Sequence, residues 1–145
     1  MPILNLGKST KVSRPINSTT AGLTAINGSA VSMAGFDAIM FICAMGALTA
    51  TQVTKLKAQG GALSDGSDAA DITGAATAAA ADADSNKLLV LDVVRPQYAY
   101  VRPVVVRGTA NAAIDGVIAI QYNIACRSPL QTQDSTVSQI AGVYF

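Results

Sequence analysis

Histidine, glutamate and tryptophan are all absent from this chain of 145 residues. Histidine is the side chain that most often moves protons near neutral pH, activates serine or cysteine nucleophiles and binds metal ions. Its absence excludes the usual hydrolase triads and every imidazole metal site. We therefore expect a protein that is not an enzyme, with no catalytic residue, no bound metal and no cofactor.

Charge is also scarce, at 13% of residues, and all nine acidic residues are aspartates. Without glutamate, the Glu–Lys pairs that support exposed helices are missing, whereas aspartate is a turn residue. Ten basic residues against nine acidic ones give a net charge of +1, far from the clustered basic excess of a nucleic-acid binder. We expect few helices and no nucleic-acid partner.

Long apolar runs are missing as well. The most apolar stretch, residues 38–48, falls well short of the ~20 residues that a helix needs to span a bilayer. Residues 1–15 lack the continuous apolar segment of a secretory signal. From these two observations we expect a soluble protein with no membrane partner.

Only two cysteines are present, Cys43 and Cys126, and both lie in apolar surroundings. Three interpretations are open: two buried thiols that act as small hydrophobic residues, a disulfide, or a reactive thiol. Neither cysteine has a lysine or histidine near it in the sequence to stabilise a thiolate. Buried thiols are therefore the favoured interpretation.

What the chain does contain is a series of short apolar stretches separated by Gly, Asn and Asp. Stretches rich in Val, Ile, Leu and Tyr are typical of strands. They lie at residues 38–48, 49–59, 86–94, 98–108 and 117–124. With further short strands nearer the N-terminus, the chain has seven or eight, which indicates an antiparallel β-sandwich or barrel. The sequence therefore predicts an all-β fold.

Four local patterns make more specific predictions. Asn27-Gly28 is a strong hairpin-turn dipeptide, and the run 38–48, apolar on both parities, is typical of a strand with both faces covered. Pro103 cannot donate to a ladder and predicts an edge strand or a bulge. Residues 69–81, rich in alanine but interrupted by a glycine, fit either a strand followed by a loop or a short helix.

Composition divides the chain into three parts. Residues 1–22 are polar and predict an extended N-terminal arm, residues 23–126 the β-sandwich domain, and residues 127–145 a C-terminal arm. The final residues include the apolar Val143, Tyr144 and Phe145. For this last part three interpretations are open: a strand that folds back onto its own domain, an arm that docks on a neighbouring subunit, or disorder.

Arginine recurs at Arg95, Arg102 and Arg107 among strand-forming residues. Offsets of seven and five place successive arginines on opposite faces of a strand, so they form no single basic stripe. Tyr98, Tyr100 and Arg102 share a parity, and Tyr with Arg is the composition of an interface anchor. Two interpretations are open: Arg–Asp pairs within the domain, or contact with a partner. The candidate partner-binding residues are Arg14, Arg95, Tyr98, Tyr100, Arg102, Arg107, Val143, Tyr144 and Phe145.

The segments GFDAIMFICAMGALTA and DSNKLLVLDVVRPQYAYVRPVVVRGTANAAIDGVIAIQY resemble the capsid cement or decoration proteins, a family of small structural proteins of tailed phages. Members share a strand that begins AGFD, a VLDVxRP strand, a YVRPVVxR strand and AxIDGVIAIQY near the end. The resemblance covers about residues 22–125, and its second segment is the more specific. The matching residues are Gly35, Phe36, Asp37, Asp92, Arg95, Pro96, Arg102, Pro103, Asp115 and Gly116.

This resemblance implies a jelly-roll β-sandwich on the outer surface of a phage head, where it bridges neighbouring major capsid subunits of an HK97-fold shell. We also expect self-association as a homodimer or trimer, because an oligomer that grips several capsomers gains in effective concentration. The alternative is a carbohydrate- or receptor-binding jelly-roll module on a virion. That alternative needs aromatic platforms, and only 5% of the residues are aromatic.

Overall fold

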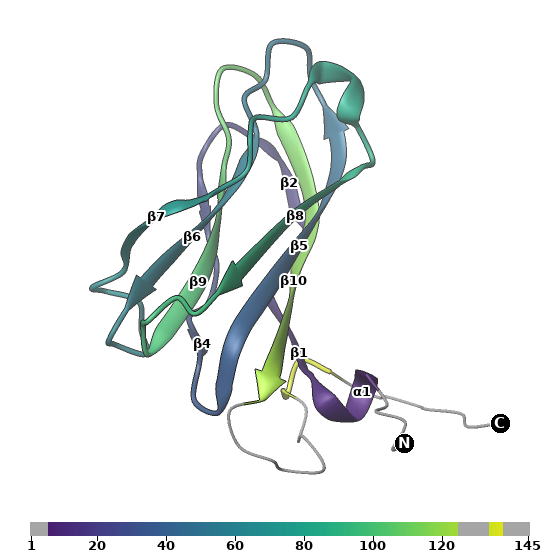
Figure 1. The fold of residues 1–145 in the computed structure, drawn as a ribbon. Helices are drawn as coiled ribbons and strands as arrows, with labels where there is room; N and C mark the ends of the chain where they lie inside the picture. The colour runs from purple at the N-terminus through teal and green to yellow at the C-terminus, as the bar shows by residue number, and fades with distance from the viewer. Residues whose placement is uncertain (1–5, 125–133, 138–145) are drawn as a thin grey trace, which may run out of the picture.

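The computed structural model describes residues 6–124 and 134–137 of the chain. In that part of the chain, two antiparallel sheets pack face to face (Figure 1). Sheet A contains β1 (Lys11–Ile16), β2 (Thr19–Gly22), β5 (Phe36–Leu48), β8 (Leu88–Val94) and β10 (Ala112–Ile124). Sheet B contains β3 (Ile26–Asn27), β4 (Val31–Ser32), β6 (Lys55–Gly61), β7 (Ala70–Ala76) and β9 (Tyr100–Val106). The helical elements are α1 (Leu6–Ser9) and the 3-10 turn η1 (Asp82–Asp84).

The strand order is that of a jelly roll. β1 and β2 lie end to end along β10, and β3 and β4 lie end to end along β9, so each pair forms one interrupted strand. The order is then β1-β10-β5-β8 in sheet A and β3-β9-β6-β7 in sheet B, which is the arrangement of two Greek keys in a jelly roll. The predicted all-β sandwich is confirmed.

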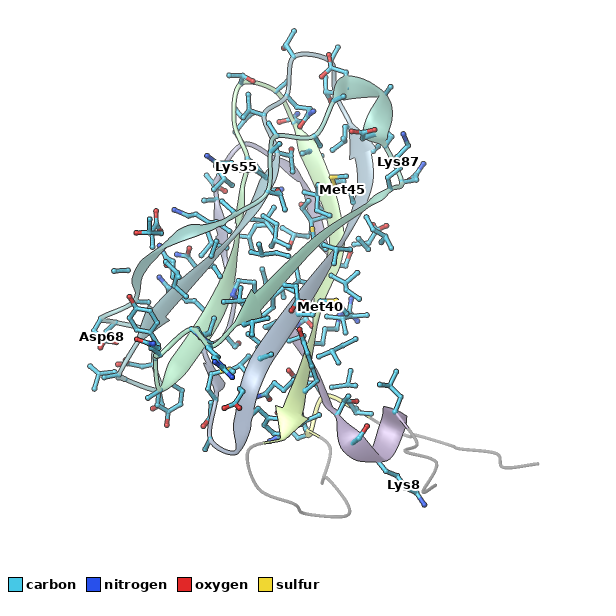
Figure 2. All side chains as sticks on the ribbon, viewed as in Figure 1. Lys8, Met40, Met45, Lys55, Asp68 and Lys87 are labelled. Atoms are coloured by element: carbon cyan, nitrogen blue, oxygen red, sulfur yellow. The ribbon has the colours of Figure 1, made fainter. Side chains whose placement is uncertain are left out.

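The core lies between the two sheets and follows the period-two alternation of strands. In β5 the inward residues include Ile39, Phe41 and Cys43, which face Val101 and Val105 of sheet B. Each fully buried side chain of this size contributes about 1.5–3 kcal/mol. Charged side chains lie at the periphery, as Figure 2 shows for those that it labels.

The predicted N-terminal arm is partly incorporated into sheet A. Residues 11–22, which the sequence assigned to the arm, form β1 and β2 and pair with β10. Their polar composition is tolerated because an edge strand has one side and one face open to water. The sheet therefore begins at Lys11, before the predicted domain boundary.

The hairpin predicted at Asn27-Gly28 is wrong. The apolar stretches on either side of this dipeptide do not pair with each other but both pair with β9, with a one-residue register shift between them. The Gly28 N–H donates to the Pro103 carbonyl oxygen at 2.8 Å. A Cβ at Gly28 would lie 2.7 Å from the Pro103 ring, so glycine is needed for this close approach.

Pro103 lies in β9, which is an interior strand with neighbours on both sides. The predicted edge position is therefore wrong, while the predicted irregularity is present in the neighbouring strand. Because the Pro103 carbonyl faces Gly28, the proline nitrogen faces the same side, at the break between β3 and β4. No ladder hydrogen bond is lost there, because the neighbouring strand is already interrupted.

Two other local predictions have clear outcomes. Residues 69–81 form β7 followed by a loop rather than a helix, which confirms the first alternative. The run 38–48 lies within β5, and one of its faces packs in the core. Its other face lies on the outside of sheet A, so the prediction of a strand covered on both faces is wrong for the part of the chain that the structure describes. Among the same residues, no helix is long and apolar enough to cross a bilayer.

Candidate interaction surfaces

The connection between β8 and β9, residues 95–99, joins the two sheets at one end of the sandwich. Arg95 and Gln97 on either side of Pro96 both have left-handed backbone angles, with φ of +52° and +58°. The Arg95 N–H donates to the Asp37 carbonyl oxygen at 2.7 Å. Left-handed non-glycine residues cost about 1–3 kcal/mol each and cluster at functional sites. We therefore regard the 95–98 loop as a candidate site.

Two shallow hollows flank the 95–98 loop. One, of about 340 Å³, is lined by the loop together with Met33, Phe36 and Asp37, and the other, of about 490 Å³, lies between β7 and β8. The Arg95 side chain is exposed, and it is absent from the ion pairs and side-chain hydrogen bonds among residues 6–124 and 134–137. Its guanidinium therefore has its donors available for a carboxylate of a partner.

Tyr98 does not share a face with Tyr100 and Arg102, contrary to the parity prediction. β9 begins only at Tyr100, so the strand alternation does not extend back to Tyr98. A Cβ at Gly60 would overlap the Tyr98 ring, and Gly60 has the inward parity of β6. Tyr98 therefore closes the end of the sandwich, with 40% of its surface exposed.

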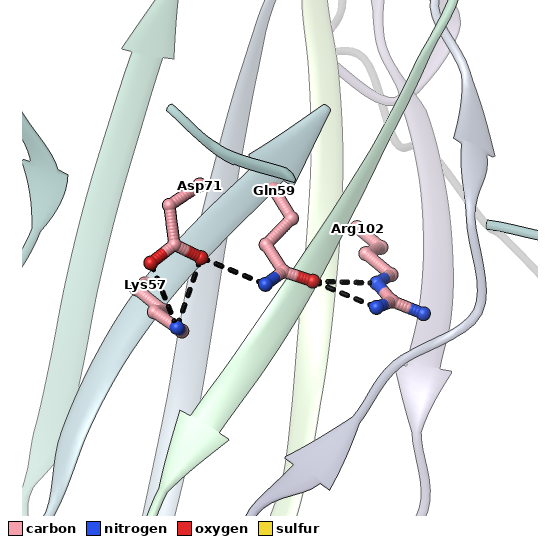
Figure 3. Close-up of polar contacts among 4 residues, drawn as sticks. All are labelled: Lys57, Gln59, Asp71 and Arg102. Atoms are coloured by element: carbon pink, nitrogen blue, oxygen red, sulfur yellow. Dashed lines mark hydrogen bonds and ion pairs between the residues drawn. The ribbon is translucent and has the colours of Figure 1, made fainter. Parts of the chain in front are cut away.

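Tyr100 and Arg102 do lie on one face, the outer face of sheet B. Figure 3 shows the polar network around Arg102. Arg102 Nε and Nη2 donate to Gln59 Oε1 at 2.9 and 2.7 Å. Gln59 Nε2 in turn donates to Asp71 Oδ1 at 2.7 Å, and Lys57 Nζ forms an ion pair with Asp71. The hydrogen bond from Gln59, followed by that from Lys57, lowers the pKa of Asp71.

Arg107 is a structural residue, and its assignment as a partner-binding residue is wrong. It is only 8% exposed. Its Nε donates to the Thr24 carbonyl at 2.7 Å, and its Nη1 donates to the carbonyls of Thr20 and Ala112 at 2.9 and 2.8 Å. The side chain thus ties the segment that leaves sheet A after β2 to the start of β10. The expected Arg–Asp pairing is not what holds it, because all three acceptors are backbone carbonyls.

Arg14 is exposed but contacts its own chain. Its Nη2 donates to the Asp115 carbonyl oxygen at 3.0 Å and its backbone N–H donates to Thr136 Oγ1 at 2.9 Å. Asp115 and Gly116, which interrupt the register of β10, form a bulge that the Arg14 guanidinium covers. Of the predicted C-terminal arm only residues 134–137 are described. The candidates Val143, Tyr144 and Phe145, and also Cys126, lie outside the described residues.

An exposed aliphatic surface on the outer face of sheet A is the feature that sequence reasoning missed. Val90, Ile42 and Ile118 lie side by side across β8, β5 and β10. The most exposed side chains of the face are Leu88 (60%), Val94 (57%), Val90 (50%) and Ile118 (44%). The run 38–48, apolar on both parities, could have indicated this surface. A two-layer sandwich covers each sheet on one face only, so the second apolar face of such a strand is left exposed.

Tyr122 and Asp92 provide the polar contact on this aliphatic face. The Tyr122 hydroxyl lies 2.6 and 2.7 Å from the two Asp92 carboxylate oxygens. This hydrogen bond to Asp92 is the main cause that raises the pKa of Tyr122 to about 12. The Asp92 carboxylate thus accepts a hydrogen bond from its own sheet. This hydrogen bond lowers the desolvation cost of covering the face with a partner.

The raised pKa of Tyr122 predicts a specific alkaline loss of stability. An ordinary tyrosine in the unfolded chain titrates near pH 10, while Tyr122 in the folded chain titrates at about 12. Its contribution is therefore complete below about pH 10 and is lost as the pH rises toward 12. In urea unfolding at increasing pH, Tyr122→Phe should lose less stability over this range than the wild type. Asp92→Asn should behave like Tyr122→Phe, and an unchanged pH dependence in both variants would contradict this assignment.

Cys43 is a free thiol, fully buried in β5. Burial, with a smaller contribution from Asp115, raises its pKa to about 12. The thiolate is therefore not formed at neutral pH, and Cys43 packs as a small hydrophobic residue, as the sequence predicts.

Within residues 6–124 and 134–137, no three acidic or cysteine side chains are grouped as they would be to hold a metal ion. Neither the comparison with protein-family models nor that with curated proteins finds a match. The fold and the surfaces define a jelly-roll β-sandwich with an exposed aliphatic face on sheet A and an exposed arginine in the loop that follows β8.

Proposed function

We propose that this protein is a non-enzymatic cement protein of a phage capsid, which binds the outer surface of an HK97-fold shell and bridges neighbouring major capsid subunits. In this role it lies on the outside of the phage head and helps the shell resist internal pressure. The major capsid protein is its partner, and no nucleic acid, membrane or cofactor takes part.

The observation that carries the proposal is the uncovered aliphatic face of sheet A, with Arg95 directly after β8 at one end of it. Contiguous exposed apolar patches on a single domain are often interaction sites. The segments that resemble the cement family form β5, β8, the 95–98 loop, β9 and most of β10. The strands that carry the candidate surface therefore lie within the family-like segments.

Such binding would rest on the burial of apolar surface area together with a few directional polar contacts. The aliphatic residues of sheet A exclude water from the contact, and the planar guanidinium of Arg95 recognises a carboxylate on the coat subunit. An interface of about 1,200–2,000 Å² is sufficient for stable association. Many copies on one shell add their contributions without any one contact being strong.

The test is co-sedimentation of the purified protein with empty shells of the phage that encodes it. We expect saturable pelleting in a fixed ratio to coat subunits. Ile118→Lys, which places a charge in the aliphatic face, and Arg95→Ala, which removes the exposed guanidinium, should each weaken pelleting about tenfold or more, as expected for anchor residues of an interface. Melting temperatures should stay close to wild type, because both side chains are exposed.

Lys87→Ala is the matched control, because Lys87 is an exposed cation at the other end of β8 and should leave pelleting unchanged. Pelleting that is unaffected by both Ile118→Lys and Arg95→Ala would remove this surface from the proposal. No pelleting of the wild type, combined with retention on immobilised sugars, would favour the carbohydrate-binding alternative.

A further inference from the structure

Strand β8 is a free edge of sheet A. The sheet ends at β8, which pairs with β5 on one side only. Two hydrogen bonds fix the direction of its backbone groups: Arg95 N–H donates to Asp37 O, and Met45 N–H donates to Lys87 O. Both join odd-numbered residues of this segment to β5.

The unused backbone groups of β8 follow from this pattern. In an antiparallel pair, hydrogen-bonded residues alternate with residues whose N–H and C=O groups point away from the partner strand. The outward groups therefore belong to the even-numbered residues, which are Leu88, Val90, Asp92 and Val94. Among the described residues no strand pairs with them. Their backbone donors and acceptors are available along ~20 Å of strand.

The other three sheet edges carry a proline, a left-handed glycine, register shifts or very short strands, which discourage strand addition, and β8 carries none of these. β1 contains Arg14, Pro15 and a register shift, and Thr136 occupies the Arg14 N–H. β3 and β4 are two residues each, separated by a register shift. β7 has a register shift and Gly74 with φ of +82°.

β8, in contrast, pairs with β5 in one register along its whole length and contains no Pro, Gly, Lys or Arg. Natural sheets normally protect a straight, apolar edge with charge, proline or a bulge. Asp92 is the one charged residue of the strand, and it is hydrogen-bonded to Tyr122. An edge that has one such charge and neither a proline nor a bulge is suited to pairing with another strand.

We propose that β8 pairs antiparallel with β8 of a second copy of this chain, so that sheet A continues across a two-fold axis. A second β8 strand is a suitable partner, because the two strands can pair in a register that uses all of their outward backbone groups. A two-fold axis at Leu91 places Leu88 opposite Val94 and Val90 opposite Asp92, so all four outward residues of each copy form hydrogen-bonded pairs, with about eight new hydrogen bonds. The two Asp92 carboxylates are diagonal neighbours in this register and do not lie directly opposite each other, which reduces like-charge repulsion.

The dimer extends the aliphatic surface of sheet A instead of burying it. The side chains of Leu88, Val90 and Val94 remain on the outer face of the joined sheet, where they are continuous with those of the second copy. The strand contact alone is smaller than the about 800 Å² per partner of a stable interface. We therefore expect a dissociation constant in the micromolar range, and no dependence of dimer formation on a capsid.

The test is sedimentation velocity of the purified full chain over a range of concentrations, with amide hydrogen exchange measured by NMR. We expect a monomer–dimer equilibrium, and slower exchange of the Val90 and Asp92 amides as the concentration rises. Val90→Pro removes an outward N–H and leaves the ladder to β5 intact. It should raise the dissociation constant at least about tenfold, because each copy loses a ladder hydrogen bond and the ring blocks close approach.

Ile118→Lys is the matched control, since Ile118 lies on the same face but two strands away from the edge. This variant should dimerise like the wild type, although it is expected to bind shells poorly, so the capsid proposal and the dimer can fail separately. A wild-type protein that stays monomeric at all concentrations, a trimer, or a dimer lost in Ile118→Lys and kept in Val90→Pro would overturn the inference. If Val90→Pro does not fold, the concentration dependence of the wild-type amides decides the question.

Discussion

Replacing Arg107 with methionine is expected to lower the free energy of unfolding by about 1–3 kcal/mol, because the buried Ala112 carbonyl left without a donor costs about that much. The hydrogen bonds to Thr20 and Thr24 are only partly buried, so water can replace the lost donor there. The three carbonyls at stake belong to Thr20, Thr24 and Ala112. Methionine keeps most of the side-chain volume, so the loss reports the hydrogen bonds and not a cavity. Urea unfolding of both proteins at neutral pH measures the difference.

Two further variants separate the role of Arg107 from a general effect of removing charge. Arg107→Lys should restore only part of the stability, because one ammonium group cannot reproduce the planar fork that reaches three carbonyls. Arg102→Ala should cost less than about 1 kcal/mol, because the position is half-exposed and its guanidinium donates to Gln59 alone among the residues that the structure describes. Equal stability of Arg107→Met and wild type would show that these carbonyls find other donors.

The second large effect is expected at Gly60. Substitution by alanine should destabilise the protein by about 2 kcal/mol, because the new methyl group overlaps the Tyr98 ring and one of the two must move. In a Tyr98→Ala background, the same change at Gly60 should cost much less, and a double-mutant cycle measures this coupling. Gly108→Ala is the matched control, since its Cβ would have no atom within 4 Å.

This cycle also tests whether Tyr98 closes the end of the sandwich. If the two substitutions are additive, the ring does not lie against Gly60 in solution, and the 95–98 loop has a different arrangement. If they are coupled, the position of Tyr98 is fixed by packing, and the adjacent Arg95 is held at the end of the aliphatic face. In that case the co-sedimentation experiment measures binding through a loop that is already in place before the shell binds.

Much of the fold could be predicted from local patterns. Alternation in 98–108 correctly places Tyr100 and Arg102 on one face, because side chains in a strand alternate whatever the strand pairs with. The same rule failed for Tyr98, since alternation holds only within the strand and β9 begins at Tyr100. Asn27-Gly28 failed for a related reason: a turn-forming dipeptide fits equally well at a break in an edge strand.

The candidate site was less predictable, because the sequence alone does not distinguish the structural roles of the four arginines from Arg14 to Arg107. Their roles depend on which segments the fold brings beside each one. Arg107 meets three carbonyls and is buried, Arg102 meets Gln59, Arg14 covers a bulge, and Arg95 stays exposed on a strained loop. The aliphatic face was missed because the sequence does not say which of two apolar faces is covered.

The sequence by itself determined that this chain is a β protein without histidine or glutamate, because composition and strand periodicity are local properties. Tertiary structure alone decided that, among residues 6–124 and 134–137, β8 lies at a sheet edge with unpaired backbone groups and β5 has an exposed outer face. Both are consequences of pairing between segments far apart in the chain. Which strand becomes an edge is a property of the whole sheet, and no local stretch of residues encodes it.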